Sequence, residues 1–284
     1  MSRPSAALLL SMLLLPTAAA AQPGPGSLDS EAALALLEKV RLYSEGERPS
    51  DPPARLEELG PRRTSPGRRI QHRGFTSVQV NVDGAGLNIM DDAANEPSIA
   101  VDPTDSSRMA IGWRQFDSIT SSFREAGWGF SSDGGATWTA GEIDSGVFRS
   151  DPVLDADASG GFYYNSLTTP SGSLRCEVFR SDDGGASWGA AIDAFGGDKQ
   201  WMAIDRTGGL GSGHIYTNWN QAFSCCGPTG FTRSTDGGDS YEAPIDLPQL
   251  PAFATVAVAP GGEVFVAGAR GLDEVVVLRS TTLR

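Results

Sequence analysis

Short runs of apolar and polar residues fill the chain from residue 74 onward. The run Ser77–Asp83 alternates residue by residue, as a strand with one buried face does, and we predict a lone outer strand there. Twelve more strand-like runs follow in four groups of three. The first runs, which are apolar, are Glu96–Asp102, Asp151–Asp157, Lys199–Asp205 and Phe253–Ala259. The second runs are Arg108–Gln115, Phe162–Thr168, His214–Asn220 and Glu263–Arg270. The third runs are Gly127–Ser131, Cys176–Ser181, Gly230–Ser234 and Glu274–Ser280. The pattern predicts an all-β domain over residues 74–284.

A turn motif follows the third run in three of the groups. Its copies are Ser131–Trp138, Ser181–Trp188 and Ser234–Tyr241, which start 50 and 53 residues apart. The shared pattern is Ser-x-Asp-Gly-Gly-x-Thr/Ser-aromatic. The glycines adopt positive φ at little cost, and the Asp carboxylate can accept hydrogen bonds from its own turn. We therefore interpret Asp133, Asp183 and Asp236 as structural residues. A fourth strand after each turn, at this period, is typical of β-propeller blades.

The motif resembles the Asp-box, or BNR repeat, of the sialidase superfamily. The resemblance implies a sialidase-like β-propeller of four-stranded blades with Asp-box turns. Such propellers have six blades, and the fourth group stops at Ser280–Arg284, where another Asp-box would begin. We therefore expect about four blades, an incomplete six-bladed ring. The family also implies three arginines on a substrate carboxylate, an Asp acid/base, and a Tyr nucleophile assisted by a Glu.

The first 73 residues lack the repeated strand-like runs of this domain. Residues 1–21 have the charge, apolar segment and Ala19-Ala20-Ala21 site of a signal peptide, so we expect a secreted or periplasmic protein cleaved after Ala21. Residues 22–73 contain a predicted amphipathic helix over residues 28–44 and a Pro/Arg-rich stretch, residues 45–73, that we interpret as a flexible linker. No later segment is apolar over enough length for a membrane helix, which predicts no membrane insertion.

The net charge of the chain restricts its binding partners, and its cysteines restrict disulfide pairing and metal binding. The chain has 22 Lys and Arg against 35 Asp and Glu, a net charge of −13, which argues against nucleic acid and anionic membrane surfaces. Cys176, Cys225 and Cys226 allow one disulfide between adjacent blades in an exported protein, with one cysteine left over. Their spacing fits no zinc site, and we expect neither a metal nor a cofactor.

Propeller topology places the candidate chemistry on the face opposite the Asp-box turns. The starts of the first strands align Glu96, Asp151, Lys199 and Phe253 in one column. The polar residues at the ends of the second strands, or near them in sequence, are Arg114, Asn220, Arg270, Arg149 and Asp117. Carboxylates there can act as a general acid or base, and arginines can hold a carboxylate ligand. The alternative is that these charges pair with one another between blades.

Two functions remain open on this pattern. By resemblance, Arg114, Arg149 and Arg270 match the arginine group, Asp151 or Asp117 the acid, with Glu96, Lys199 and Asn220 as ligand-binding candidates. The Arg-Ile-Pro motif of the family is absent, since Arg69-Ile70-Gln71 lacks the proline, and the nucleophilic Tyr would come from a late blade. We therefore favour a non-catalytic module that binds carbohydrate, which could be sialylated, or an extracellular protein. The alternative is an exo-α-sialidase-type glycoside hydrolase when full length.

Overall fold

The structure is a computed structural model, and it describes residues 49–54, 60–170, 172–271 and 273–280. The predicted signal peptide and the predicted helix over residues 28–44 lie outside these ranges. The described chain is all-β, as predicted, and its single helical element is the short 3-10 helix η1 (Gln221–Phe223).

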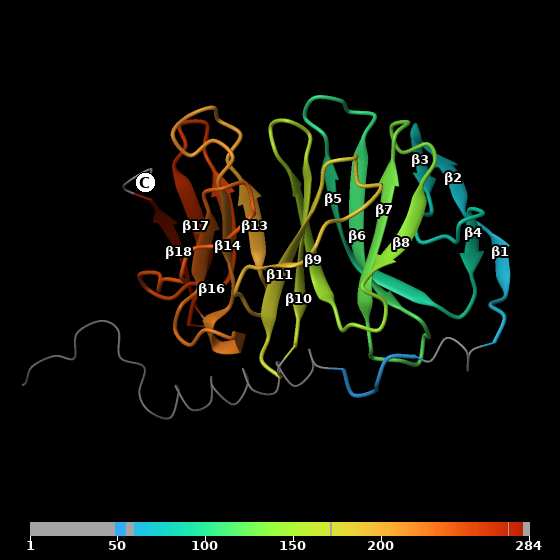
Figure 1. Ribbon diagram of the computed structural model, residues 1–284, viewed down its shortest axis with the longest axis horizontal. Helices are drawn as coiled ribbons and strands as arrows, with labels where there is room; N and C mark the ends of the chain where they lie inside the picture. Colours follow the sequence, from blue (N-terminus) through green and yellow to red (C-terminus); the bar gives the residue numbers. More distant parts are fainter. Residues whose placement is uncertain (1–48, 55–59, 171, 272, 281–284) are drawn as a thin grey trace, which may run out of the picture.

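Four antiparallel sheets make up the body of the molecule (Figure 1). The first contains β5 (Ala93–Val101), β6 (Met109–Phe116), β7 (Glu125–Ser131) and β8 (Thr139–Ile143). The second contains β9 (Ser150–Ala156), β10 (Phe162–Thr168), β11 (Arg175–Ser181) and β12 (Ile192–Asp193). The third contains β13 (Trp201–Ile204), β14 (Ile215–Asn218) and β15 (Phe231–Ser234). The fourth contains β16 (Ala252–Val258), β17 (Val264–Arg270) and β18 (Glu274–Arg279). These strands match the twelve predicted runs of the four groups to within a few residues.

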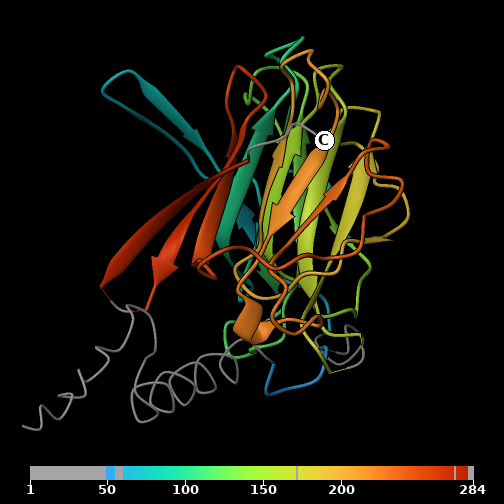
Figure 2. The ribbon, with the colours of Figure 1, turned by 90° about the vertical axis from the view of Figure 1, so that its left-hand side faces the viewer.

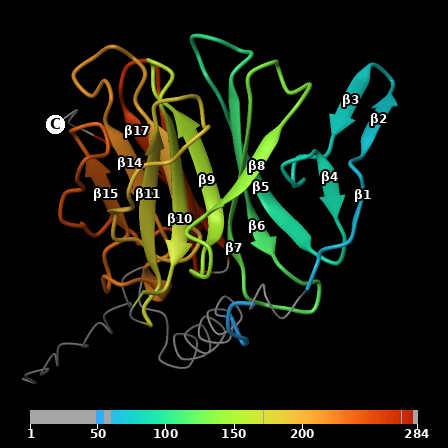
Figure 3. The same cartoon turned by 45° about the vertical axis from the view of Figure 1, so that its right-hand side comes forward.

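The sheets stand side by side and pack face to face (Figures 1 and 3). The first strand of each sheet contacts the first strand of the next, in the order β5, β9, β13, β16. Three apolar clusters fill the three spaces between neighbouring sheets. Phe162 and Phe179 lie between the first and second, Tyr163 and Ile215 between the second and third, and Val256 between the third and fourth. Burial of these faces holds the array together, since each sheet alone has no covered face.

Two predictions about the outer parts were wrong. The fourth strand expected in the third group is reduced to a single bridge between Phe231 and Ile245. The stretch interpreted as a linker contains β1 (Thr64–Pro66), which pairs with β4 (Leu87–Ile89), and β2 (Arg69–His72).

The lone outer strand predicted at Ser77–Asp83 is not formed as such. Only Ser77 and Val78 of that run lie in a strand, at the end of the hairpin strand β3 (Phe75–Val78). β2 pairs with β3 across a turn at Arg73 and Gly74, where φ is 46° and 83°. This hairpin projects from the sheets (Figures 2 and 3). The sequence pattern did not reveal β2 and β3, because a hairpin with a two-residue turn pairs locally and needs no apolar face.

The three repeated turns have one hydrogen-bonding scheme. In the second, Asp183 Oδ1 accepts from the Ser181 hydroxyl and from the Ser187 N–H, at 2.8 and 2.9 Å, and Oδ2 accepts from the Ser187 hydroxyl at 2.6 Å. Asp133 and Asp236 accept the equivalent three bonds at 2.5–3.0 Å. The carboxylates therefore close their own turns, as their interpretation as structural residues requires.

Replacing Asp183 by alanine should destabilise the protein. The substitution removes three hydrogen bonds and leaves the Ser187 N–H without its acceptor, so we expect a loss of about 1–3 kcal/mol. Urea unfolding measures it. Asp182→Ala is the matched control, because Asp182 is exposed and pairs only at the surface with Arg180. Equal losses in the two variants would contradict the structural role.

The same turns should make stability depend on acid pH. Hydrogen bonds from Thr137, then Ser131, lower the pKa of Asp133 to about 2, and bonds from Ser240 and Ser234 do the same for Asp236. Because the folded pKa lies below the unfolded one, this stabilisation is present above pH ~4 and is lost as the pH falls towards 2. Melting temperatures of the wild type and Asp236→Asn should therefore converge over that range. A gap that stays constant from pH 5 to about 2 would contradict this assignment.

Candidate functional site

A pocket of about 310 Å³ lies where the four first strands begin. Its lining consists of three consecutive residues from each sheet: Glu96–Ser98, Asp151–Val153, Lys199–Trp201 and Phe253–Thr255. The four residues aligned from the sequence therefore line one pocket: Glu96, Asp151, Lys199 and Phe253. The register places this pocket at the opposite end of the sheets from the repeated turns, because Asn95 pairs with Arg114 at one end and Met109 with Ser131 at the other.

The backbone repeats at this column. Glu96, Asp151, Lys199 and Phe253 have φ values of 49°, 48°, 53° and 49°, the left-handed region that non-glycine residues seldom adopt. The strand register shifts beside this position in the first, second and fourth sheets. A residue held in this conformation costs on the order of 1–3 kcal/mol, and such residues gather at ligand sites. Sequence spacing located the column but gave no sign of this conformation, since no glycine marks it.

Charges from three sheets meet around Asp151. The Arg114 guanidinium lies 2.6 Å from a Glu96 oxygen and 3.7 Å from Asp151 Oδ1, and Lys199 Nζ lies 3.4 Å from Asp151 Oδ2. Asp151 is 7% exposed and also accepts a hydrogen bond from Ser150 at 2.6 Å. The charges therefore do pair between sheets, which was the alternative raised from the sequence. They do so beside the pocket, so pairing and ligand binding are compatible here.

Two aromatic side chains also line the pocket. Trp201 is 46% exposed and Phe253 is 50% exposed, although both belong to the first strands of their sheets. Trp201 was missed as a candidate. The signal available was its place two residues after Lys199 on an apolar strand.

The other predicted site residues lie elsewhere. Arg149 is buried over the Phe179 ring and pairs with Asp144 and Glu177 at 2.8 and 2.7 Å. Arg270 pairs with Glu274 across its own hairpin at 2.9 Å. The expected convergence of Arg114, Arg149 and Arg270 was therefore wrong. Strand spacing specifies the end of the sheet and, in a regular strand, the face, but the register shift and left-handed backbone at Asp151 interrupt that alternation.

Asn220 also stays outside the pocket lining. It is 2% exposed and stands directly before η1, and its backbone N–H donates to the Asp198 carbonyl at 2.9 Å. Its position supports the loop that leads out of β14.

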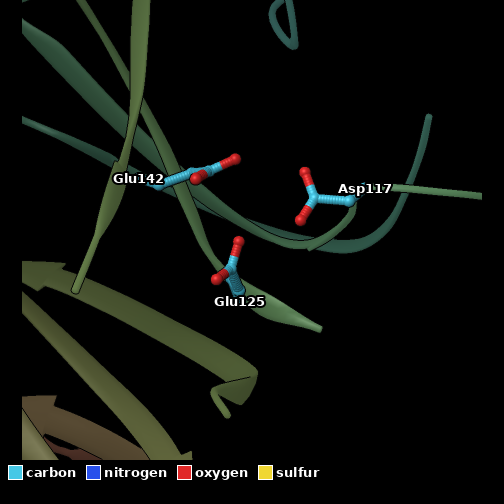
Figure 4. A group of neighbouring side chains, drawn as sticks. All are labelled: Asp117, Glu125 and Glu142. Carbon is cyan, nitrogen blue, oxygen red and sulfur yellow. The ribbon is translucent and has the colours of Figure 1, made fainter. Parts of the chain in front are cut away.

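Asp117 belongs to a separate group of carboxylates (Figure 4). It follows β6 and pairs with Arg62 at 2.8 Å, and its carboxylate faces those of Glu125 and Glu142. Burial of the carboxyl group, and then the like charges of Glu125 and Asp117, raise the pKa of Glu142 to about 7. Burial also raises the pKa of Glu125. Asp117 and Asp151 thus occupy different sites and cannot act on one substrate group.

A larger groove of about 600 Å³ separates the third and fourth sheets. Its walls are mostly apolar and include Phe231, Ile245, Leu247, Val264 and Val266. It lies where the third sheet has a single bridge in place of a fourth strand. We interpret it as a packing gap rather than a site, because these side chains, apart from the exposed Ile245, belong to the core or pack against it.

The cysteines pair differently from the prediction. Cys225 and Cys226 form a disulfide with each other, and Cys176 is a free, buried thiol. Cys176 packs with Phe223 of η1, and burial raises its pKa. Cys176 therefore packs near the segment that carries Cys225 and Cys226, as adjacent sheets allow, but it forms no disulfide with either of them.

Comparisons with known proteins rest on structure alone. No protein-family model and no curated protein sequence matches the chain. A Dyadobacter fermentans protein of unknown function is 17% identical over 71% of this chain and 68% of its own, with a TM-score of 0.48. The leech intramolecular trans-sialidase is 18% identical over 61% of this chain and 29% of its own, with a TM-score of 0.44. A Hadza microbial sialidase is 11% identical over 73% of this chain and 47% of its own, with a TM-score of 0.48.

The chain therefore spans less than half the length of the two sialidases compared. At these identities, no residue role is transferred from them. Within the described ranges, no helix has the length and apolarity to cross a membrane.

Proposed function

We propose that this chain is a secreted, sialidase-like Asp-box β-propeller module that binds carbohydrate without hydrolysing it. The observation that carries the proposal is the pocket at the starts of the four first strands. It combines a charged group, Arg114, Asp151 and Lys199, with the exposed rings of Trp201 and Phe253. Its volume suits a small ligand or a terminal sugar rather than a protein surface.

Each component of the pocket suits a sugar ligand. Aromatic rings can cover the apolar C–H faces of a pyranose, and charged groups can orient its hydroxyls. The cations of Arg114 and Lys199 can also attract a sugar carboxylate, and the guanidinium can do so in a bidentate manner. A sugar carboxylate would compete with Glu96 and Asp151 for these two cations, and this competition is how the pocket could select a sialylated glycan.

The second candidate is an exo-α-sialidase-type glycoside hydrolase. The Asp-box resemblance and the buried Asp151 beside the pocket favour it. Against turnover, Arg149 and Arg270 are engaged by carboxylates outside the pocket. The Tyr163 and Tyr164 hydroxyls donate to backbone carbonyls of Gly237 and Gly127, which suits packing rather than attack on a substrate. Burial also raises the pKa of Tyr163 to about 12, away from that of an activated nucleophile.

Calorimetric titration with 3'-sialyllactose, with lactose as the neutral control, tests the proposal. We expect saturable binding of the sialylated sugar, weaker binding of lactose, and loss of binding in Trp201→Ala and Lys199→Ala. Leu210→Ala is the matched control, because Leu210 is 82% exposed and outside the pocket lining. Absence of saturable binding to either sugar, and to a panel of other glycans, would overturn the proposal.

A fluorogenic sialoside assay separates the two candidates. The binding module should show no turnover. Turnover that Asp151→Asn abolishes would establish the hydrolase instead.

Export is the part of the proposal that rests on residues 1–21. The positive charge at Arg3, the apolar segment and the alanine site support cleavage after Ala21. N-terminal sequencing of exported material should begin at Gln22. Finding Met1 intact would refute the cleavage.

A further inference from the structure

Three carboxylates from three segments of the first sheet face one another at the end of that sheet opposite the repeated turns (Figure 4). Asp117 follows β6, Glu125 begins β7 and Glu142 lies in β8, and one carboxylate oxygen from each lies within 4.8 Å of the others. Strand pairing sets this arrangement, since Gln115 pairs with Glu125 and Gly127 pairs with Glu142. The group is therefore held by the sheet and not by a flexible loop alone.

The Glu125 carboxylate faces Asp117 and Glu142 (Figure 4) and, among the described residues, has one buried oxygen without a hydrogen-bond partner. Glu125 is 3% exposed, and its Oε1 accepts a hydrogen bond from the Gly146 N–H. Its Oε2 is buried and has no hydrogen-bond partner in the described part of the protein. A buried carboxylate oxygen without a partner destabilises the folded protein, and a cation bound beside it would remove that cost.

The charge balance points to a divalent cation. Three carboxylates and the guanidinium of Arg62, which pairs with Asp117, leave a net charge of −2 when all are ionised. A divalent cation would neutralise this net charge of −2. Ligands that are all oxygen atoms select hard cations such as Ca²⁺ and Mg²⁺ over Zn²⁺.

Coordination chemistry favours the larger of these two ions. Ca²⁺ accepts about 6–8 oxygen ligands in a flexible geometry, whereas Mg²⁺ demands a near-ideal octahedron and gives up its waters reluctantly, so three carboxylates held in place by strand pairing suit Ca²⁺ better. We propose that Asp117, Glu125 and Glu142 bind one Ca²⁺ ion and so join β7 and β8 to the segment after β6. Waters fill the remaining positions, as Ca²⁺ takes about 6–8 oxygen ligands. The site is independent of the carbohydrate pocket, whose lining includes none of these residues.

Calorimetric titration of the metal-stripped full chain with CaCl₂ tests this site. We expect one site with a dissociation constant on the order of 10⁻⁴ to 10⁻³ M, the range of extracellular Ca²⁺ modules, and a Ca²⁺-dependent rise in melting temperature. Glu142→Gln and Asp117→Asn should each weaken binding by about tenfold or more, because each removes one charged ligand. Glu142 is exposed as a whole residue, although its carboxyl group is partly covered by its neighbours, so its variant should fold.

Glu242→Gln is the matched control. Glu242 is an exposed carboxylate whose partner is Arg233 in the third sheet, and its variant should bind Ca²⁺ like the wild type. Absence of binding at CaCl₂ concentrations of about 10 mM would overturn the proposal. The three carboxyl groups would then be a cluster whose members share protons instead of binding a cation. Equal affinity of Glu142→Gln and the wild type would place binding elsewhere. Mg²⁺ binding as tight as Ca²⁺ binding would overturn the choice of ion.

Discussion

Replacing Phe162 by alanine should lower the free energy of unfolding by about 3–5 kcal/mol. Phe162 begins β10 and is completely buried in the cluster between the first and second sheets, with Leu154 and Phe179. Truncation removes its buried apolar surface and leaves a cavity that the surrounding strands can only partly close. Urea unfolding followed by tryptophan fluorescence measures the loss.

Phe75→Ala is the matched control for this substitution. Phe75 carries the same side chain on β3, where it is 80% exposed, so its removal should change stability by about 0.5 kcal/mol or less. Similar losses in the two variants would mean that the sheets do not pack face to face. A large loss confined to Phe162 supports the face-to-face array on which the pocket depends.

Replacing Arg114 by alanine should cost about 1–3 kcal/mol, because it removes the partner of Glu96 and one of the two cations beside the buried Asp151. Arg114 contacts Glu96 and Asp151, and Asp151 then retains Lys199 at 3.4 Å as its nearest cation. The same substitution should weaken sialoside binding, because the guanidinium contacts Glu96 and Asp151, two residues of the pocket lining. Urea unfolding and calorimetric titration measure the two effects.

Arg270→Ala controls for the loss of an arginine at the same end of the sheets. Its ion pair with Glu274 is exposed, so we expect a cost of about 0–1 kcal/mol and unchanged binding. Adding Asp151→Asn to Arg114→Ala should recover part of the lost stability, because the buried charge is then gone. Equal losses in the two arginine variants, or no recovery in the double variant, would show that Arg114 does not neutralise Asp151.

The sequence by itself determined the strands and their turns. The twelve runs of the four groups, from Glu96–Asp102 to Glu274–Ser280, coincide with strands because alternation and turn residues act over a few positions. The roles of Asp133, Asp183 and Asp236 followed from the same local chemistry, since each carboxylate bonds within four residues of itself. The period of the repeat also brought Glu96, Asp151, Lys199 and Phe253 to one column, because successive sheets repeat the same path.

Only the tertiary structure decided which of these residues act together. Arg149 and Asp151 are two positions apart, yet Arg149 packs over Phe179 while Asp151 lines the pocket, because the left-handed backbone at Asp151 and the register shift beside it interrupt the regular alternation. Spacing could not reveal the left-handed backbone at the column, because its residues carry ordinary side chains. The group of Asp117, Glu125 and Glu142 was also hidden, because the register of three consecutive strands, which the spacing did not specify, brings the carboxylates together, and Arg62 joins them from a distant segment. Local interactions fix the strands, whereas the chemistry of a site depends on distant segments that only the packed sheets bring together.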